Sequence, residues 1–121
     1  MKTNLTHIKL GVSDIEKSVK WYTEVLGFEV DSCMPAENPT YYDFKGEGAC
    51  FSIGLADGGK IYHGGRTNFE VEDADKLWEK LRDKVKVIEP IWDTPCGTRK
   101  FTIADPDGNE LGFSVQLTCR E

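Results

Sequence analysis

A carboxylate near the C-terminal end of the chain is well placed for chemistry. Glu110 follows the sequence Asp-Pro-Asp-Gly-Asn at 105–109, whose proline and glycine favour a tight turn. Apolar and polar residues alternate after this turn, so Glu110 shares one strand face with the small residues Gly112 and Ser114. A carboxylate on such a roomy face can bind a metal ion, hold a ligand or act as a general base. The alternative is a solvated glutamate at the end of a strand.

An internal repeat gives three other residues the same kind of position as Glu110. Residues 7–14 align with 66–73, and residues 50–55 align with 110–115, with their apolar positions in register. The aligned strands begin with polar or reactive side chains on the face opposite the apolar one: His7, Cys50, Arg66 and Glu110. We therefore expect these four side chains to face a shared concavity. The alternative is a chance match between two halves of similar patterning.

The elements that must position these residues form two similar sets. In the first half, alternation predicts a strand at 7–12, and Ser13 with Glu16 predicts a capping box for the helix that follows. Gly27 is a typical residue for the end of this helix. Further strands are expected to begin at 28–30 and to cover 41–44 and 50–55.

The second half repeats this order. A glycine-rich linker at 57–65 precedes a strand through 67–71 and a helix capped by Asp73, and the remaining strands are expected at 85–88, 101–104 and 110–117, with a loop at 91–98. The sequence thus predicts an α+β fold of two βαβββ modules, about 4–56 and 66–118, in a single domain at 1–121. Each module is too small to bury both faces of its sheet alone. We therefore expect a curved mixed sheet with a concave cavity, and helices on its outer face.

The composition narrows the class of protein. The chain has 121 residues, 39% of them hydrophobic, which suits one folded domain. The net charge of −6 argues against a general nucleic-acid or anionic-membrane binder. We see no leader sequence and no long apolar run, and therefore expect a cytoplasmic protein without a membrane span. Its dispersed cysteines, without a Cys-x-x-Cys pair, are expected to be reduced: Cys33, Cys50, Cys96 and Cys119.

Several segments carry a family resemblance. They are residues 7–22, 26–30, 69–73 and 105–113, which together resemble the vicinal oxygen chelate superfamily. This superfamily includes glyoxalase I, extradiol dioxygenases, fosfomycin-resistance thiol transferases and bleomycin-binding resistance proteins. The resemblance implies that His7 and Glu110 ligate a divalent metal such as zinc, nickel, manganese or iron, with Cys50, or Ser52 if the register slips, as a third ligand. It also implies that Glu110 could transfer a proton as a catalytic residue.

Two positions depart from the pattern of the metal-dependent relatives. Arg66 stands where the dioxygenases and fosfomycin-resistance enzymes need a second histidine, and Cys50 stands where glyoxalase I carries a glutamate. Arginine is permanently charged and has no lone pair for a metal, so Arg66 favours an anionic ligand or a salt bridge to Glu110 or Glu70. His63 lies three residues before Arg66, but it is not expected to supply the missing histidine ligand. A register shift of three residues would turn the apolar side chains of this strand into the cavity.

Each metal candidate has a plainer interpretation. His7 could hydrogen-bond a neighbour without binding metal, and Cys50 could pack as a small buried residue. Aromatic side chains are expected to line the pocket beside Arg66, because small-molecule sites are mostly apolar. These candidates are Tyr42 or its neighbour Tyr41, Trp92 and Phe101, and each could belong to the core instead.

Two functions follow from these features, and a purely structural or regulatory dimer is a third possibility. The first is a small-molecule-binding protein of this superfamily with an incomplete metal site and a compact ligand that can be anionic. The second is a divalent-metal-dependent lyase, isomerase or thiol transferase of the glyoxalase I or fosfomycin-resistance kind, in which His7 and Glu110 hold the cation. The cofactor is unknown unless it is that metal. We expect a homodimer, because relatives commonly pair two chains, with the modules pairing within one chain or across the dimer.

Overall fold

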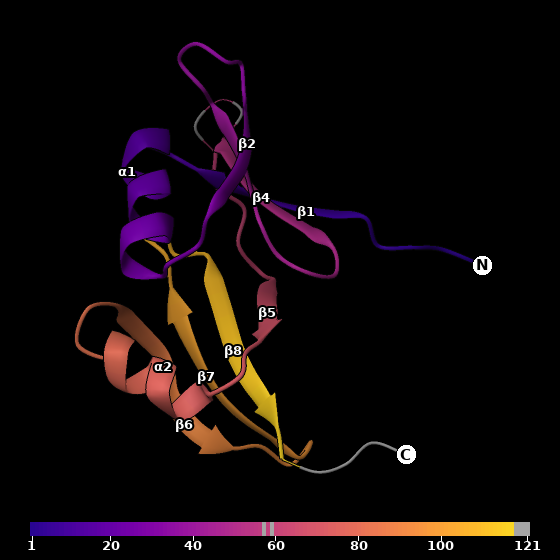
Figure 1. The fold of residues 1–121 in the computed structure, drawn as a ribbon, viewed down its shortest axis with the longest axis vertical. Helices are drawn as coiled ribbons and strands as arrows, with labels where there is room; N and C mark the ends of the chain where they lie inside the picture. The colour runs from indigo at the N-terminus through magenta and orange to yellow at the C-terminus, as the bar shows by residue number, and fades with distance from the viewer. Residues whose placement is uncertain (57, 59, 118–121) are drawn as a thin grey trace. The chain divides into compact units, whose positions relative to one another are not determined.

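The structure is a computed structural model that describes residues 1–56, 58 and 60–117 (Figure 1). The chain divides into two compact units, residues 1–62 and 63–121, which we treat as module 1 and module 2. Cys119 and positions 57 and 59 of the predicted linker lie outside the described residues. Among the described residues, no helix is long and apolar enough to cross a membrane.

Module 1 is a four-stranded mixed sheet with one helical segment. Its sheet has the strand order β1-β4-β3-β2, in which β1 runs parallel to β4 and the other pairs are antiparallel. The helix α1 continues directly into a π-helical turn, η1. In chain order the elements are β1 (His7–Val12), α1 (Ile15–Lys20), η1 (Trp21–Val25), β2 (Val30–Met34), β3 (Tyr41–Phe44) and β4 (Cys50–Leu55).

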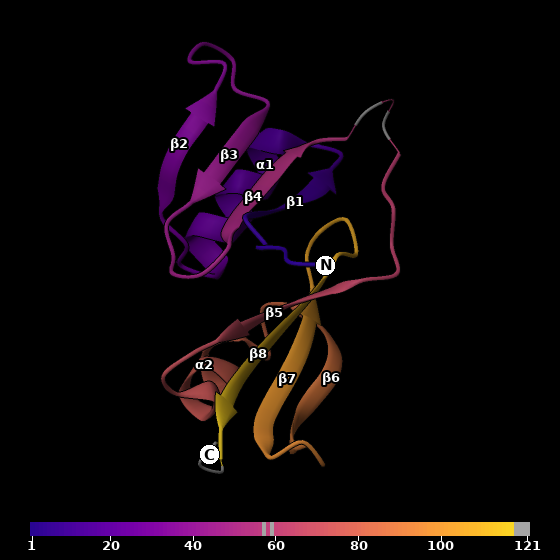
Figure 2. The same cartoon turned by 90° about the vertical axis from the view of Figure 1, so that its right-hand side faces the viewer.

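Module 2 repeats this topology. Its sheet has the order β5-β8-β7-β6, again with the first pair parallel and the others antiparallel. The elements are β5 (Arg66–Glu70), α2 (Ala74–Leu81), β6 (Lys86–Asp93), β7 (Thr98–Ala104) and β8 (Glu110–Gln116). In each module the helix lies against one face of the sheet (Figure 2). The predicted α+β fold of two βαβββ modules with mixed sheets is therefore confirmed, whereas the shared concavity stays a prediction.

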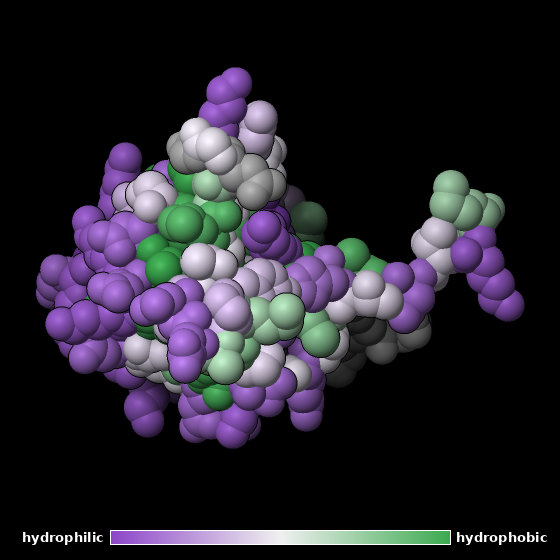
Figure 3. Space-filling view, turned by 90° about the horizontal axis from the view of Figure 1, so that it is seen from above, coloured by the Kyte–Doolittle hydropathy of each residue, from purple (hydrophilic) through white to green (hydrophobic). Residues whose placement is uncertain are grey.

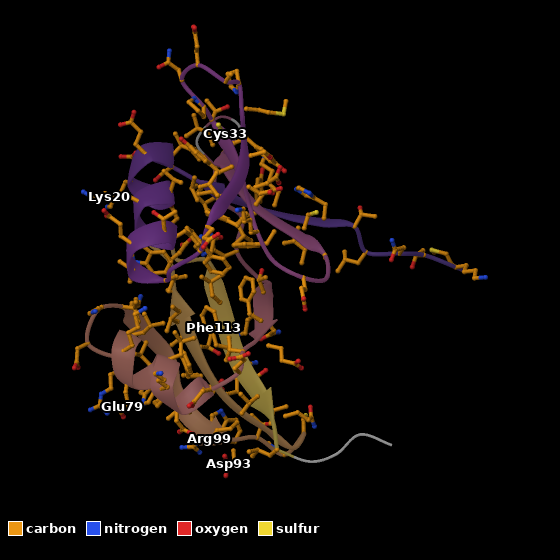
Figure 4. The ribbon with its side chains drawn as sticks, in the orientation of Figure 1. Lys20, Cys33, Glu79, Asp93, Arg99 and Phe113 are labelled. Carbon is orange, nitrogen blue, oxygen red and sulfur yellow. The ribbon has the colours of Figure 1, made fainter. Side chains whose placement is uncertain are left out.

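Aromatic side chains build the core between each helix and its sheet. In module 1, Tyr22 of η1 is fully buried and packs against Phe44 and Phe51, with ring centroids 5.5 and 5.8 Å away. In module 2, Phe101 lies between Trp78 of α2 and Phe113 of β8, at 5.3 and 5.4 Å. Figure 4 shows Phe113 inside this module, whereas Lys20 and Glu79 point outward from their helices. The apolar strand faces predicted by alternation thus form the cores.

An aspartate caps the helix of each module at equivalent positions of the repeat. Asp14 Oδ1 accepts a hydrogen bond from Lys17 N at 3.1 Å, and Asp73 Oδ1 accepts one from Lys76 N at 3.0 Å. Both capping residues have extended backbone, as is usual at this position. The prediction that Asp73 caps the second helix is confirmed. The predicted capping box that begins at Ser13 is wrong, because the cap lies one residue later.

The predicted loop at 91–98 is also wrong in extent, because both strands of this hairpin are longer than expected. β6 continues to Asp93 and β7 begins at Thr98, so only a tight turn remains between them. Register shifts between Val87 and Glu89 and between Glu89 and Trp92 accommodate Pro90 inside the edge strand. A proline is tolerated at such irregular edge positions, and this rule explains why it did not end the strand.

The turn before Glu110 has the predicted tight geometry. Asp105 Oδ1 accepts hydrogen bonds from the backbone N–H groups of Asp107 and Asn109 at 2.9 and 2.8 Å. Gly108 adopts a φ of 87°, which glycine reaches without a steric cost. The His63 ring packs against this glycine, so a Cβ there would lie 2.8 Å from the ring. This turn fixes where β8 begins and therefore where Glu110 lies.

The molecular surface is mostly hydrophilic in the view of Figure 3, as expected for a chain of net charge −6. Apolar residues are visible in several places among the polar ones in the same view. Exposed apolar residues of module 1 include Val30, Met34 and Leu55.

At the end of module 2, Arg99 and Asp93 lie together, and a hydrogen bond of 2.8 Å joins Arg99 Nη1 to Asp93 Oδ1 (Figure 4).

Candidate functional site

The open face of each sheet, opposite its helix, carries the polar residues that the sequence predicted. The strand register places His7 opposite Cys50 in module 1 and Arg66 opposite Glu110 in module 2. The repeat aligned His7 with Arg66 and Cys50 with Glu110, and these equivalent residues begin the equivalent parallel strands of the two modules.

In module 1, two hydroxyl groups lie against the same nitrogen of His7. Tyr41 Oη and Ser52 Oγ are each 2.7 Å from His7 Nε2. The rings of His7 and Tyr41 are nearly parallel, with centroids 6.0 Å apart. His7 thus has hydrogen-bonding neighbours, as its plainer interpretation proposed. These neighbours contact Nε2, one of the two ring nitrogens through which a histidine can bind a metal ion.

Asp43 extends this arrangement to the far edge of the sheet. Tyr41 donates its hydroxyl hydrogen to Asp43 Oδ1 at 3.0 Å, and Ser32 donates to Asp43 Oδ2 at 3.0 Å. Desolvation raises the pKa of the Tyr41 phenol above its ordinary value, and Asp43 raises it further, whereas the interaction with Ser52 lowers it. Tyr41 is therefore a protonated hydrogen-bond donor at neutral pH. The chain of contacts crosses all four strands of the sheet.

The structure corrects two details of module 1. Tyr41, rather than Tyr42, lies beside His7, because Tyr42 is on the same strand face as the core residue Phe44. The choice of Tyr42 for the open face is therefore wrong. Tyr42 instead lines a shallow hollow of about 500 Å³ beside the start of α1. Cys50 is exposed, which excludes its interpretation as a small buried residue.

In module 2, Arg66 forms an ion pair with Glu110. Its Nε and Nη2 atoms donate to Glu110 Oε1 at 3.0 and 2.8 Å. Its Nη1 atom lies 3.7 Å from Glu89 Oε1, and Thr102 donates its hydroxyl hydrogen to that same oxygen at 3.2 Å. The salt bridge between Arg66 and Glu110 that the sequence suggested is therefore present. One guanidinium lies between two carboxylates, so its charge is already compensated.

Two aromatic candidates of module 2 have different surroundings. Trp92 is paired with Lys100, which places it on the open face, and 43% of its surface is exposed. It is accessible to a ligand. Phe101 has no exposed surface and packs against Trp78 of α2. The prediction that Phe101 lines a pocket is therefore wrong, because its strand parity directs it to the core.

The space expected over the small residues of β8 is partly filled. A Cβ at Gly112 would collide with the Asn68 side chain and would lie 2.9 Å from Lys100 Cε. In module 1, a Cβ at Gly54 would lie 3.3 Å from Lys9 Nζ. A lysine therefore lies across a glycine of the central strand in each module. Glycine permits this close approach because it has no Cβ.

Within each module taken by itself, the residues present do not form the divalent-metal site that the superfamily resemblance implies. Within either module, the described His, Cys, Asp and Glu side chains nowhere gather in a group of three that could hold a metal ion. The positive charge of Arg66 lies on the expected ligand Glu110 at hydrogen-bond distance. A cation brought to this carboxylate would be repelled by a group that cannot lose its charge.

Sequence reasoning missed several polar residues of these faces. They are Ser32, Asp43, Glu89 and Thr102. Strand alternation already placed Asp43 on the same face as Tyr41, so the signal was available once Tyr41 was chosen. Glu89 had no such signal, because bulges on both sides of it change the parity of β6.

Comparison with known proteins places the chain in a family. Residues 4–113 match the model of the Glyoxalase/Bleomycin resistance protein/Dioxygenase superfamily. The chain belongs to this superfamily. The resemblance found in the sequence is thus confirmed, and the βαβββ modules are the form that this superfamily takes here.

Two curated relatives of this superfamily member are named as enzymes. It is 30% identical over 125 residues to the trivalent organoarsenical cleaving enzyme of Bacillus sp. (strain MD1), covering 95% of this chain and 74% of the relative. It is 28% identical over 113 residues to the probable trivalent organoarsenical cleaving enzyme of Bacillus subtilis (strain 168), covering 88% and 76%.

Solved structures share the fold of this superfamily member. TnmS3, an antibiotic binding protein from Streptomyces sp. CB03234, has a TM-score of 0.72 at 24% identity over 95% of this chain and 97% of its own. TioX from Micromonospora sp. ML1 has a TM-score of 0.76 at 19% identity over 96% and 98%. At these identities the likeness concerns the fold alone.

Proposed function

We propose that this chain is a small-molecule-binding protein of the superfamily that works without a metal ion at Glu110. One observation carries the proposal: Arg66, the register partner of Glu110, donates two hydrogen bonds to its carboxylate. Supporting it, His7 Nε2 lies against the hydroxyls of Tyr41 and Ser52. Glu110 Oε1 and His7 Nε2, two atoms that could ligate a metal, therefore have protein partners already.

The ligand of this proposal is compact and carries both an apolar and a polar part. Trp92 is an exposed aromatic surface on the open face of module 2, and Lys100 is its cross-strand neighbour. An anionic group of the ligand would pair with Lys100. Arg66 is a weaker anchor than its charge suggests, because an anion would have to displace Glu110 from it. The proposal also includes a homodimer in the cytoplasm, which light scattering and fractionation would test.

Tryptophan fluorescence in a buffer with a chelator tests the proposal. A library of small aromatic acids and antibiotics is screened, and each hit is titrated by calorimetry with and without EDTA. We expect a hit whose affinity is unchanged by EDTA and is lost in Trp92→Ala. Trp21→Phe, on the helix of module 1, serves as the control for loss of a fluorophore. A hit whose binding disappears in EDTA would contradict the proposal.

The two curated relatives favour a second candidate, a lyase that cleaves the carbon–arsenic bond of trivalent organoarsenicals. Trivalent arsenic is soft and prefers thiolate ligands, and this chain has exposed thiols at Cys50 and Cys96. The assay incubates the protein with a trivalent phenylarsenical in the presence of zinc, nickel, manganese or iron(II). Inorganic arsenite is then measured. Release that is lost in Glu110→Gln would favour this lyase over the binding protein.

A further inference from the structure

The two carboxylates that contact Arg66 come from strands that are not neighbours in the sheet. Glu110 lies on β8 and Glu89 lies on β6, with β7 between these strands. The Arg66 side chain starts from the edge strand β5, contacts Glu110 on the next strand and approaches Glu89 within 3.7 Å. A single guanidinium therefore connects both edges of the open face.

The three nitrogen atoms of the Arg66 guanidinium face two different carboxylates. Nε and Nη2 share Glu110 Oε1, while Nη1 is directed to Glu89 Oε1. Thr102 donates a further hydrogen bond to that same oxygen of Glu89. Without a cation, the two carboxylates would repel each other and favour protonation. The guanidinium thus meets the electrostatic need that a metal ion meets in a carboxylate site.

We infer that Arg66 takes the place of the divalent cation that the superfamily implies, holding Glu110 and Glu89 in position and keeping metal ions away from Glu110. This inference rests on the proposed function, because it requires a native protein without metal at Glu110. It goes further by assigning the exclusion to one side chain. Arg66 is therefore a positioning residue.

Module 1 offers an independent parallel. His7, the repeat equivalent of Arg66, has its Nε2 atom 2.7 Å from both Tyr41 Oη and Ser52 Oγ. Here hydroxyl groups, rather than a charged group, occupy the space next to the nitrogen. The expected ligand atom is thus hydrogen-bonded by hydroxyl groups in module 1 and by a guanidinium in module 2. Only in module 2 is the partner a permanently charged group, Arg66. We therefore expect that a single substitution can make the site bind a metal ion only in module 2.

Replacing Arg66 tests the inference directly. Arg66→His removes the permanent charge and offers an imidazole beside Glu110 and Glu89, a ligand set that suits divalent transition metals. Arg66→Lys keeps a positive charge, and Arg66→His combined with Glu110→Gln removes one ligand. Each variant is titrated with Co²⁺, followed by visible absorbance and calorimetry. We expect stoichiometric binding by Arg66→His alone. A folded Arg66→His that binds no more Co²⁺ than the wild type overturns the inference.

A second measurement keeps the inference testable if Arg66→His does not fold. The Nε–H group of Arg66 gives its own nitrogen–proton NMR signal, whose exchange is slowed by the bond to Glu110. We expect this signal to persist in wild-type protein with excess Zn²⁺ and to weaken in Glu110→Gln. Loss of the signal on adding Zn²⁺ overturns the inference. If the wild type itself holds metal through Glu110, the proposed function fails as well, whereas a metal-free wild type with an unresponsive variant overturns only the inference.

Discussion

At the scale of single residues, the open faces are defined by how each polar group finds a partner. Arg66 and Glu110 are neighbours by strand register, and each is about one third exposed, at 31% and 38% of the side chain. Such a pair is screened by water, so it contributes little to stability. The consequence that we propose for it is chemical: its positive charge keeps metal ions away from Glu110.

Removing this ion pair should therefore affect stability only slightly. Arg66→Ala is expected to lower the free energy of unfolding by about 1 kcal/mol or less, the range for a partly exposed pair. Urea denaturation measures this. Arg82→Ala is the control, because Arg82 pairs with Glu79 at 3.4 Å on a more exposed helix surface. A loss several times larger in Arg66→Ala would mean that the pair is a main structural support.

Tyr41 should make stability fall at high pH. Its pKa is raised in the folded state, chiefly by desolvation, so the folded protein holds the phenol proton more tightly than the unfolded chain. This contribution is complete below the ordinary tyrosine pKa of 10.0 and is lost as the pH rises from there through the folded-state pKa. We expect Tyr41→Phe to remove this part of the pH dependence in urea denaturation curves. Tyr62→Phe, an exposed tyrosine, is the control, and an identical pH profile for Tyr41→Phe and wild type would contradict the prediction.

At the scale of elements, one turn and one of the two helix caps were predicted from local signals, whereas the cap of α1 lies at Asp14 rather than at the predicted Ser13. The turn at 105–109 and the cap at Asp73 follow from residues adjacent in sequence. The long hairpin of β6 and β7 was not predicted, because Pro90 suggested a strand end whereas the bulges beside it accommodate a proline. Tyr42 and Phe101 were misassigned because alternate residues of a strand face opposite sides of the sheet. This alternation places both residues on the helix-covered face.

The turn before β8 should tolerate no side chain at Gly108. Gly108→Ala meets both a φ of 87° and the His63 ring, so we expect a loss of about 1–2 kcal/mol in the free energy of unfolding. Gly46→Ala is a matched control in the turn between β3 and β4, because a Cβ there meets nothing within 4 Å. Thermal and urea denaturation compare the two variants. Equal stability of both would show that this turn does not constrain β8.

The helix caps offer a second test at this scale. Asp73→Ala removes the acceptor for Lys76 N and should lower the free energy of unfolding by about 1 kcal/mol, the usual value for an N-cap. Asp73→Asn keeps an acceptor and should recover most of it. Asp83→Ala, past the end of α2, controls for loss of an aspartate. Equal losses in Asp73→Ala and Asp73→Asn would indicate that charge, rather than the hydrogen bond, stabilises the helix.

At the scale of the whole molecule, the repeat was the strongest sequence signal. It predicted two βαβββ modules and the four equivalent residues His7, Cys50, Arg66 and Glu110, which begin the parallel strands. The match to the superfamily over residues 4–113 agrees with this. The partners of those residues were harder to predict. The ion pair of Arg66 was one of two interpretations, and the hydroxyls beside His7 depend on the pairing of β3 with β4. Pairwise strand contacts of this kind are not encoded in alternation alone.

The metal content of the wild-type protein tests the central claim most directly. Tag-free protein is equilibrated separately with zinc, nickel, manganese and iron(II), passed through a desalting column and analysed by mass spectrometry of the metal. Glu110→Gln is treated in parallel. We predict that both proteins retain only traces of each metal, because Arg66 already pairs with Glu110. Stoichiometric metal in the wild type that is lost in Glu110→Gln would contradict the account.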